Sequence, residues 1–218
     1  MAITSYNDLK AAIQVWVARS DSTFGNQVET LIGFHEQRMY NGSGEGPTDP
    51  LFCDPLRVPE IETTATVTIA SGVGTVPTDA VAIRTITRDS DLVGLEYMTP
   101  RQWALRDSEN SGGDPGYYTA EAGQLKITPS YDGDITVAYY KKFTAISVDN
   151  QSNAVLTAYP LVYLTGCLFE AFSFLQEPDL ALGHFARYRS MVAGINQGAN
   201  AVRYGGGPLR IRTRQGMP

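Results

Sequence analysis

The spacing of apolar residues along this 218-residue chain changes twice, from a helical period to a strand period and back. A first helix is predicted from Ser5, which with Asp8 resembles a capping box, and a second from about Gln27, across the turn SDSTFGN. Their apolar faces are Leu9, Ile13, Trp16 and Val17 in the first and Val28, Leu31, Ile32, His35 and Met39 in the second. The two helices are expected to pack as a hairpin.

A glycine- and proline-rich segment at residues 41–50, NGSGEGPTDP, separates this pattern from a period of two. Alternating strand positions are Ile61, Thr63, Ala65, Val67 and Ile69, then Val81 and Ile83, and later Ile135, Val137 and Tyr139. A hairpin is predicted around the turn at residues 121–124, with Tyr117 and Tyr118 in the strand before it and residues 125–127 in the strand after it. Thr99, Pro100 and Gln102 indicate the start of a short helix.

The helical period returns from Asn153. Its apolar face is Leu161, Leu164, Leu168, Phe172 and Leu175. Glu177, Pro178 and Asp179 end that helix and begin another, which carries Leu182, Phe185, Val192 and Ile195 and is expected to end near Gly198. The apolar run at residues 159–175 contains Glu170 and Gly166, so it predicts a buried core helix rather than a membrane span.

These patterns predict an α+β fold. N- and C-terminal helices, at about 5–40 and 153–198, form a bundle, and a small β module at about 56–147 is inserted between them. Residues 1–198 are the body. Residues 199–218 hold three consecutive glycines and Pro208 and cannot supply a core, so they are expected to form an extended C-terminal arm.

Charge is distributed unevenly between body and arm. Residues 1–179 contain 11 Lys and Arg and all 23 Asp and Glu, whereas residues 180–218 contain six arginines and no acid. This asymmetry suggests that the arm meets a partner's surface, although a merely solvated basic tail gives the same pattern. An acidic body opposes direct binding of nucleic acid. The alternating run RIRTR suits a strand added to a protein partner.

No motif indicates catalysis, a cofactor or a metal site. The histidines, His35 and His184, each lie in an amphipathic helical pattern, and neither GxSxG nor HExxH occurs. The pairs Glu60/Glu62 and Asp132/Asp134 alternate within strands, which places both members on one solvated face. Cys53 and Cys167 lack a CxxC partner, and a buried free thiol is expected at Cys167.

Several segments together resemble the head-to-tail adaptor family of tailed phages, as found in short-tailed phages and gene-transfer agents. They are MAITSYNDLKAAIQVWVARSD, LVGLEYMTPRQW, GYYTAEAGQLKITPSYDGDITVAYYKKFTAIS, LTAYPLVYLTGCLFEAFSFLQEPD and GGGPLRIR. The resemblance runs from residue 3 to about residue 212, and order and spacing carry it. The loop at residues 41–50 and the neighbourhood of Cys53 depart from it.

The resemblance implies a structural virion protein of the neck, made in the host cytoplasm and not an enzyme. It implies a homo-oligomeric ring, typically of twelve copies, beneath the portal protein, which continues the DNA channel and offers a platform to a downstream neck or tail protein. DNA would pass without sequence-specific binding. It also implies that the arm reaches the portal through Arg203, Tyr204, Leu209, Arg210, Ile211, Arg212 and Arg214.

Two other functions remain open at this point. Within the virion, the alternative is a neighbouring neck or tail-completion protein, which the N-terminal helix pair disfavours. In a different class stands an accessory hydrolase or carbohydrate-binding protein that uses the β module. Its aromatic platform would be Tyr117, Tyr118, Tyr139 and Tyr140, but strand aromatics more often pack in a core.

Overall fold

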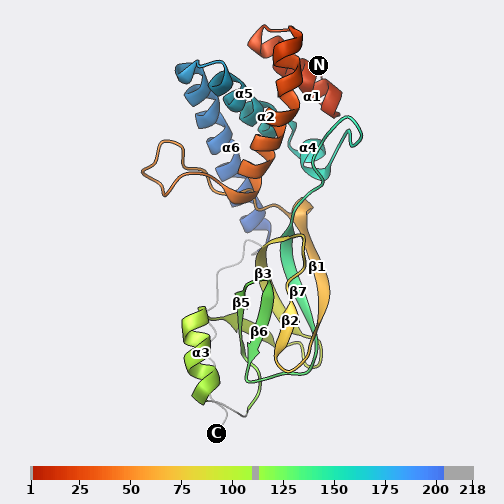
Figure 1. The fold of residues 1–218 in the computed structure, drawn as a ribbon, viewed down its shortest axis with the longest axis vertical. Coiled ribbons are helices and arrows are strands. Elements are labelled where there is room, and N and C mark those ends of the chain that lie inside the picture. Colours follow the sequence, from red (N-terminus) through yellow and green to blue (C-terminus); the bar gives the residue numbers. More distant parts are fainter. Residues whose placement is uncertain (1, 110–112, 204–218) are drawn as a thin grey trace. The chain divides into compact units, whose positions relative to one another are not determined.

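The computed structural model describes residues 2–109 and 113–203. The chain divides into two compact units, Met1–Pro59 with Ala145–Pro218, and Glu60–Thr144. We call them the helical unit and the β unit (Figure 1). The described residues contain six α-helices and one seven-stranded sheet, which confirms the mixed α+β class. The finer description, a single bundle carrying an insertion, stays a prediction.

The helical unit is arranged around α5, Pro160–Phe174. Its other helices are α1 (Tyr6–Val17), α2 (Ser22–Asn41), α4 (Ala154–Ala158) and α6 (Pro178–Arg203). α5 contacts each of the other four, and nine of its 15 residues are buried. This explains its continuous apolar sequence, because a helix covered on several sides needs no polar face. Among the described residues, no helix is long and apolar enough to cross a membrane.

The start of α2 corrects one prediction. α2 begins at Ser22 rather than near Gln27, because Asp21 caps it by accepting a hydrogen bond from the Phe24 N–H at 2.9 Å. The Ser5 cap of α1 is confirmed, with its hydroxyl accepting from the Asp8 N–H at 3.2 Å. The Asp8 carboxylate, however, accepts from Thr4, which replaces the return half of a capping box.

The end of α6 corrects a second prediction. The helix was predicted to end near Gly198 but continues to Arg203, so residues 199–203 are helical rather than part of an extended arm. A glycine inside a helix costs only about 1 kcal/mol relative to alanine. Ala199 is buried and stabilises the extra turn. Residues 204–218, the rest of the predicted arm, lie outside the described residues.

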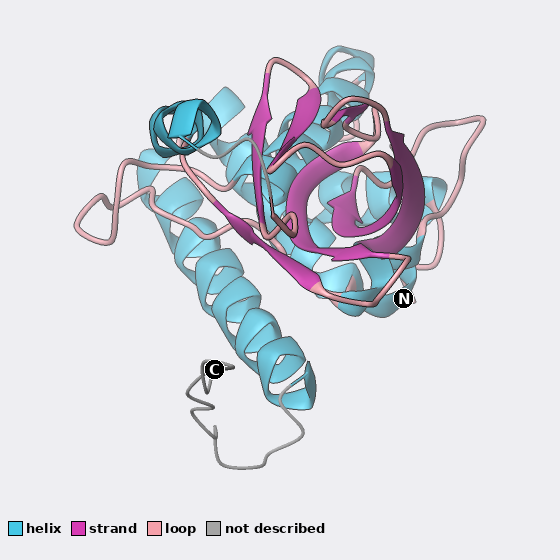
Figure 2. Ribbon diagram, turned by 90° about the horizontal axis from the view of Figure 1, so that it is seen from below, coloured by secondary structure: helices cyan, strands magenta, loops and turns pink. Residues whose placement is uncertain are grey.

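The β unit is one strongly curved sheet (Figure 2). A 3-10 turn, Pro59–Ile61, precedes it. Its strands are β1 (Glu62–Ile69), β2 (Val73–Thr75), β3 (Ala80–Arg88), β4 (Gly94–Tyr97), β5 (Tyr117–Glu121), β6 (Gln124–Thr128) and β7 (Gly133–Lys141). The strand order is β1-β7-β3-β4-β5-β6-β2, and only β4 and β5 pair in parallel.

Five of the alternating positions predicted from sequence lie in the core of this sheet, whereas Ile61 lies in the preceding 3-10 turn and Thr63 and Val81 are only partly buried. Val67, Ile69, Ile135, Val137 and Tyr139 are buried in one cluster. The predicted hairpin is present, with Glu121 paired to Gln124 across its turn. The short helix α3 (Pro100–Glu109) begins as predicted. There the Thr99 N–H donates to Gln102 Oε1 at 3.3 Å, and the Gln102 N–H donates to Thr99 Oγ1 at 3.4 Å.

Candidate interaction site

The predicted portal-binding residues lie at and beyond the end of α6. Arg203 is the last residue of that helix, and its Nη1 donates to Asn200 Oδ1 at 3.2 Å. The other residues of this prediction lie outside the described part of the chain, and they are Tyr204, Leu209, Arg210, Ile211, Arg212 and Arg214. The structure thus places Arg203 at the end of a helix, and the partner contacts of the arm stay a prediction.

An exposed apolar groove lies on the helical unit between α1, α5 and α6. We call it the Trp16 groove. It has a volume of about 580 Å³, and its apolar lining includes Trp16, Leu161, Leu164, Leu168 and Met191. Trp16 is 55% exposed and Leu161 60% exposed, although both were predicted to face the core. Exposed apolar patches of this kind are typical of surfaces that a partner covers.

A histidine and an arginine of α6 complete the Trp16 groove. The His184 ring stacks on Phe172 at 5.2 Å and meets Trp16 edge-on at 6.2 Å. Burial lowers the pKa of His184, and the nearby Arg187 lowers it further. Arg187, whose side chain also lines the groove, supplies its positive charge. Chemically, the groove can hold an apolar side chain and pair with an acidic group.

Sequence reasoning missed this groove for a definite reason. Helical spacing identifies the face of each helix, but not which apolar residues of neighbouring faces stay exposed. In α1, Leu9 and Ile13 are fully buried while Val15 is 73% exposed. The signal available in the sequence was that the apolar residues of α1, Val15 among them, cover more of the helix surface than the stripe that faces the core.

The helical unit encloses a buried carboxylate. Glu36 is only 3% exposed. Its Oε1 accepts from the Ile146 N–H at 3.0 Å and from the Tyr163 hydroxyl at 2.9 Å. That hydroxyl accepts in turn from Asn153 Nδ2 at 2.7 Å. Desolvation raises the pKa of Glu36 despite these hydrogen bonds. The network fixes the segment that follows the β unit against α2 and α5.

His35 is the second buried polar group of α2. It is 0% exposed, and its ring meets Tyr163 and Tyr188 edge-on at 5.7 and 5.0 Å. Burial, with a smaller effect of Arg38, lowers its pKa to about 3, so the ring is neutral near pH 7. Gly166 makes room for this ring, because a Cβ there would lie 1.8 Å from His35 Cε1. The expectation that His35 is a packed residue fits this environment.

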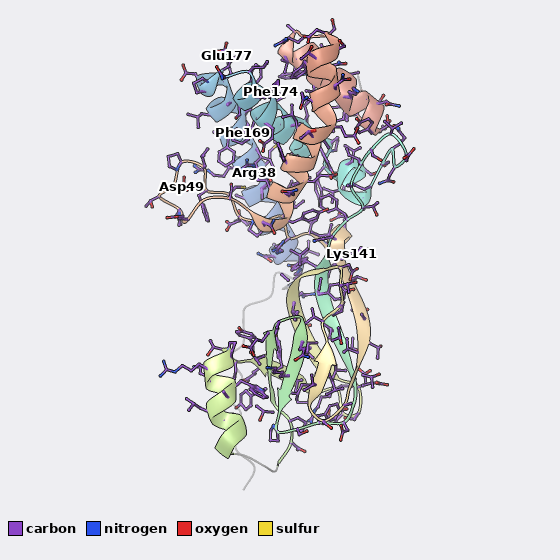
Figure 3. All side chains as sticks on the ribbon, viewed as in Figure 1. Arg38, Asp49, Lys141, Phe169, Phe174 and Glu177 are labelled. Carbon is purple, nitrogen blue, oxygen red and sulfur yellow. The ribbon has the colours of Figure 1, made fainter. Side chains whose placement is uncertain are left out.

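Arg38, on the same helix as His35, links α2 to α5. Its Nε and Nη2 donate to Glu170 Oε1 at 3.0 and 2.8 Å. The guanidinium lies over the Phe169 ring at 4.7 Å from its centroid, and Figure 3 labels both residues. A charged pair backed by an aromatic face holds two helices in one register.

The features weighed for chemistry form structural contacts instead. Tyr118, Tyr139 and Tyr140 are 4–7% exposed, so they cannot form an exposed aromatic platform with the half-buried Tyr117. Asp134 Oδ1 accepts from Thr68 Oγ1 at 2.7 Å, and Asp132 Oδ1 accepts from the Ser71 N–H. Within residues 2–109 and 113–203, no group of three or more His, Cys, Asp or Glu side chains could hold a metal ion.

Both cysteines are free and buried, which confirms the expected thiol at Cys167 and shows that Cys53 does not pair with it. Desolvation raises the pKa of Cys53 to about 11 and that of Cys167 well above its ordinary value. Such thiols are poor nucleophiles near pH 7.

A family model described as SU10 adaptor protein matches residues 4–212. No curated protein matches the chain. The family match covers both units and extends into the segment that follows α6.

Proposed function

The chain belongs to the SU10 adaptor protein family, and we propose that it forms a ring beneath the portal of a tailed phage, extends the DNA channel and links capsid to tail. As a phage adaptor it is a virion component that contacts portal and tail proteins, and its family is structural rather than enzymatic. The ring, its twelve copies, the channel and assembly in the host cytoplasm belong to the proposal.

The observation that carries this proposal is the extent of the family match. It runs from residue 4 to residue 212 and so includes most of the segment after Arg203 as well as both units. The segment after Arg203 is therefore part of the sequence that the family shares, so its role in assembly would not be that of an unrelated extension. The Trp16 groove adds support, because an adaptor needs apolar surfaces that its partners cover.

In this proposal the arm docks on the portal. Arg210, Arg212 and Arg214 would pair with acidic or backbone groups there, while Leu209 and Ile211 would occupy apolar sites. A segment that orders on its partner gives an interface that forms only on the template. The acidic body would let DNA pass, because like charges prevent the duplex from adhering.

A deletion tests the arm. Removal of residues 204–218 is expected to abolish association with the portal protein of the same phage. In a Trp103→Phe background, it should leave melting of the helical unit, followed by Trp16 fluorescence, unchanged. The matched control replaces Arg210, Arg212 and Arg214 by lysine, which keeps the charge and should retain part of the binding. Strong portal binding by the deleted chain would contradict the proposal.

A second substitution tests the Trp16 groove. Trp16→Ser removes the exposed ring, and Leu92→Ser removes a still more exposed apolar side chain from the β unit, where Leu92 is 79% exposed. We expect the first change to weaken association with portal or with other copies by about 2 kcal/mol, as for an interface tryptophan, and the second to have no effect. Sedimentation velocity measures the association of both variants. Equal behaviour of the two variants would remove the Trp16 groove from the proposal.

The alternative of a hydrolase or carbohydrate-binding protein receives no support from the β unit. Three of its four proposed platform tyrosines are buried. A hydrolase would lose activity on change of one Asp or Glu, whereas an adaptor would lose only assembly.

A further inference from the structure

The loop that follows α2 is a projection held in one conformation by its own hydrogen bonds. We call residues 43–53 the 43–53 loop. Its first and last residues form an isolated bridge, in which each N–H donates to the other's carbonyl at 2.9 Å. Inside the loop, the Asp49 carboxylate accepts from the N–H of Glu45 at 3.1 Å and of Leu51 at 2.8 Å. The loop stands out from the helices of its unit (Figure 1), and Figure 3 labels Asp49 in it. A preformed surface of this kind binds without paying for its own ordering.

The surface of the 43–53 loop combines apolar side chains with an unpaired negative charge. Leu51 is 40% exposed, and Pro47 and Pro50 are exposed as well. Glu45 is exposed, and its carboxylate forms no ion pair with any residue that the structure describes. The loop contains no Lys or Arg. A surface that covers this loop should therefore be apolar and positively charged.

The Trp16 groove has these two properties. Its lining is mainly apolar, and its volume of about 580 Å³ can hold more than one side chain. Arg187 lines it and forms no ion pair within the described part of the chain. Asp179 borders an adjoining hollow, and after it α6 carries three arginines and no acid. The groove and the 43–53 loop are thus complementary in polarity and in charge.

The groove and the loop lie on opposite flanks of α6. Arg187 lines the Trp16 groove, whereas Arg189 lines, with Pro47 of the loop, a hollow of about 230 Å³. Two residues on a helix are separated by about 200°, and Tyr188 between them is fully buried. One copy therefore cannot place its own loop in its own groove. A contact between two different faces joins copies head to tail, which closes a ring where the rotation permits.

We propose that the Trp16 groove of one copy receives the 43–53 loop of the next copy. Leu51 and the neighbouring prolines would pack against Trp16, and Glu45 would pair with Arg187. This inference rests on the proposed function, because it assigns the contact between neighbouring copies of the proposed ring. Copies held on one portal have an effective concentration on the order of 1 mM, so a contact of modest affinity is sufficient.

An exchange of charges tests the contact. Self-association of the full-length chain is measured without portal by sedimentation velocity, at up to about 1 mM protein and about 0.15 M salt. Arg187→Glu or Glu45→Arg brings like charges together and should weaken self-association about tenfold. The double variant restores opposite charges and should recover most of this loss. Glu29→Arg, at an exposed acid of α2, is the matched control. It should neither weaken self-association nor rescue Arg187→Glu.

A mixture of two variants tests whether the contact joins different faces. Trp16→Ser impairs the groove and keeps the loop, whereas Leu51→Ser impairs the loop and keeps the groove. Each variant alone should associate about tenfold more weakly than wild type. An equimolar mixture should form dimers and no larger species, because one intact contact remains for each pair of chains. Circular dichroism checks that both variants are folded.

Several results would overturn the inference. They are a wild-type chain that stays monomeric at about 1 mM, unchanged self-association in the two charge variants, an equal effect of Glu29→Arg, and a mixture that associates no better than its components. Loss of portal binding in Trp16→Ser with unchanged self-association would assign the groove to the portal and would overturn the inference too. The deletion of residues 204–218 tests the portal contact separately, so either proposal can fail without the other.

Discussion

The two units solve the problem of a specific core in different ways. The helical unit buries a neutral histidine and a carboxylate, His35 and Glu36, among aromatic rings and hydrogen bonds. The hydrophobic cluster of the β unit contains aliphatic side chains and two tyrosines, and the Tyr139 hydroxyl donates to Asp79 at 2.8 Å. This unit also buries Arg88, Thr119 and Thr128. Buried polar groups penalise any packing that leaves them unsatisfied. In the helical unit the hydrogen bonds to Glu36 therefore favour one packing, whereas in the β unit the strand register sets which side chains meet in the core.

The two tryptophans allow each unit to be followed separately. Trp16 belongs to the helical unit and Trp103 to the β unit, and the chain has no other tryptophan. Trp103→Phe and Trp16→Phe backgrounds therefore report on one unit each.

The largest expected effect comes from the contact between α5 and His35. Gly166→Ala drives a methyl group into the His35 ring and should destabilise the helical unit by about 3 kcal/mol. Gly194→Ala is the matched control, since a Cβ there meets nothing within 4 Å, and it should stabilise α6 by about 0.5–1 kcal/mol. Urea unfolding followed by Trp16 measures both. A tolerated Gly166→Ala would show that the His35 environment is loosely packed.

The pH dependence of stability should differ between the units. His35 has a folded pKa of about 3 against an ordinary value of 6.5, so the unfolded state binds the proton between these values. Its contribution is fully present above pH 6.5 and is lost as pH falls, by about 1.4 kcal/mol per pH unit. His35→Leu should remove this slope from the helical unit and leave the β unit unchanged. Identical slopes in wild type and variant would contradict burial of a neutral His35.

Glu36 contributes with the opposite sign. Its pKa is raised in the folded state, so its contribution is present below the ordinary carboxyl range and is lost as pH rises through the raised value. Glu36→Gln should remove this contribution from the free energy of unfolding and leave the opposite slope due to His35. Urea titrations at a series of pH values, again with Trp16 as probe, compare it with wild type. The same pH dependence in wild type and variant would contradict a raised pKa of Glu36.

Two tyrosine hydroxyls give a smaller and more direct comparison. Tyr163→Phe leaves the buried Glu36 and Asn153 each short of one hydrogen bond and should cost about 2 kcal/mol. Tyr139→Phe removes one hydroxyl that donates to Asp79 and should cost about 0.5–1 kcal/mol. Equal costs would mean that the polar centre of the helical unit is no more demanding than the rim of the sheet.

The spacing of apolar residues predicted most of the fold, because burying one face of a helix or strand imposes that spacing directly. Strand positions such as Val67 and Ile135, and helix positions such as Leu9 and Phe185, are buried as expected. Boundaries depended on single side chains, as with the Asp21 cap that begins α2 early. The Trp16 groove could not be predicted, because it depends on which apolar residues neighbouring helices leave exposed. Family membership was predicted from the order of short segments and is confirmed by the match over residues 4–212.

The most direct test of the adaptor assignment is the mass of the chain in solution, by light scattering, alone and mixed with the portal protein of the same phage. A large complex is expected to form with the portal and to be lost when residues 204–218 are removed. No association at any salt concentration would contradict the adaptor assignment.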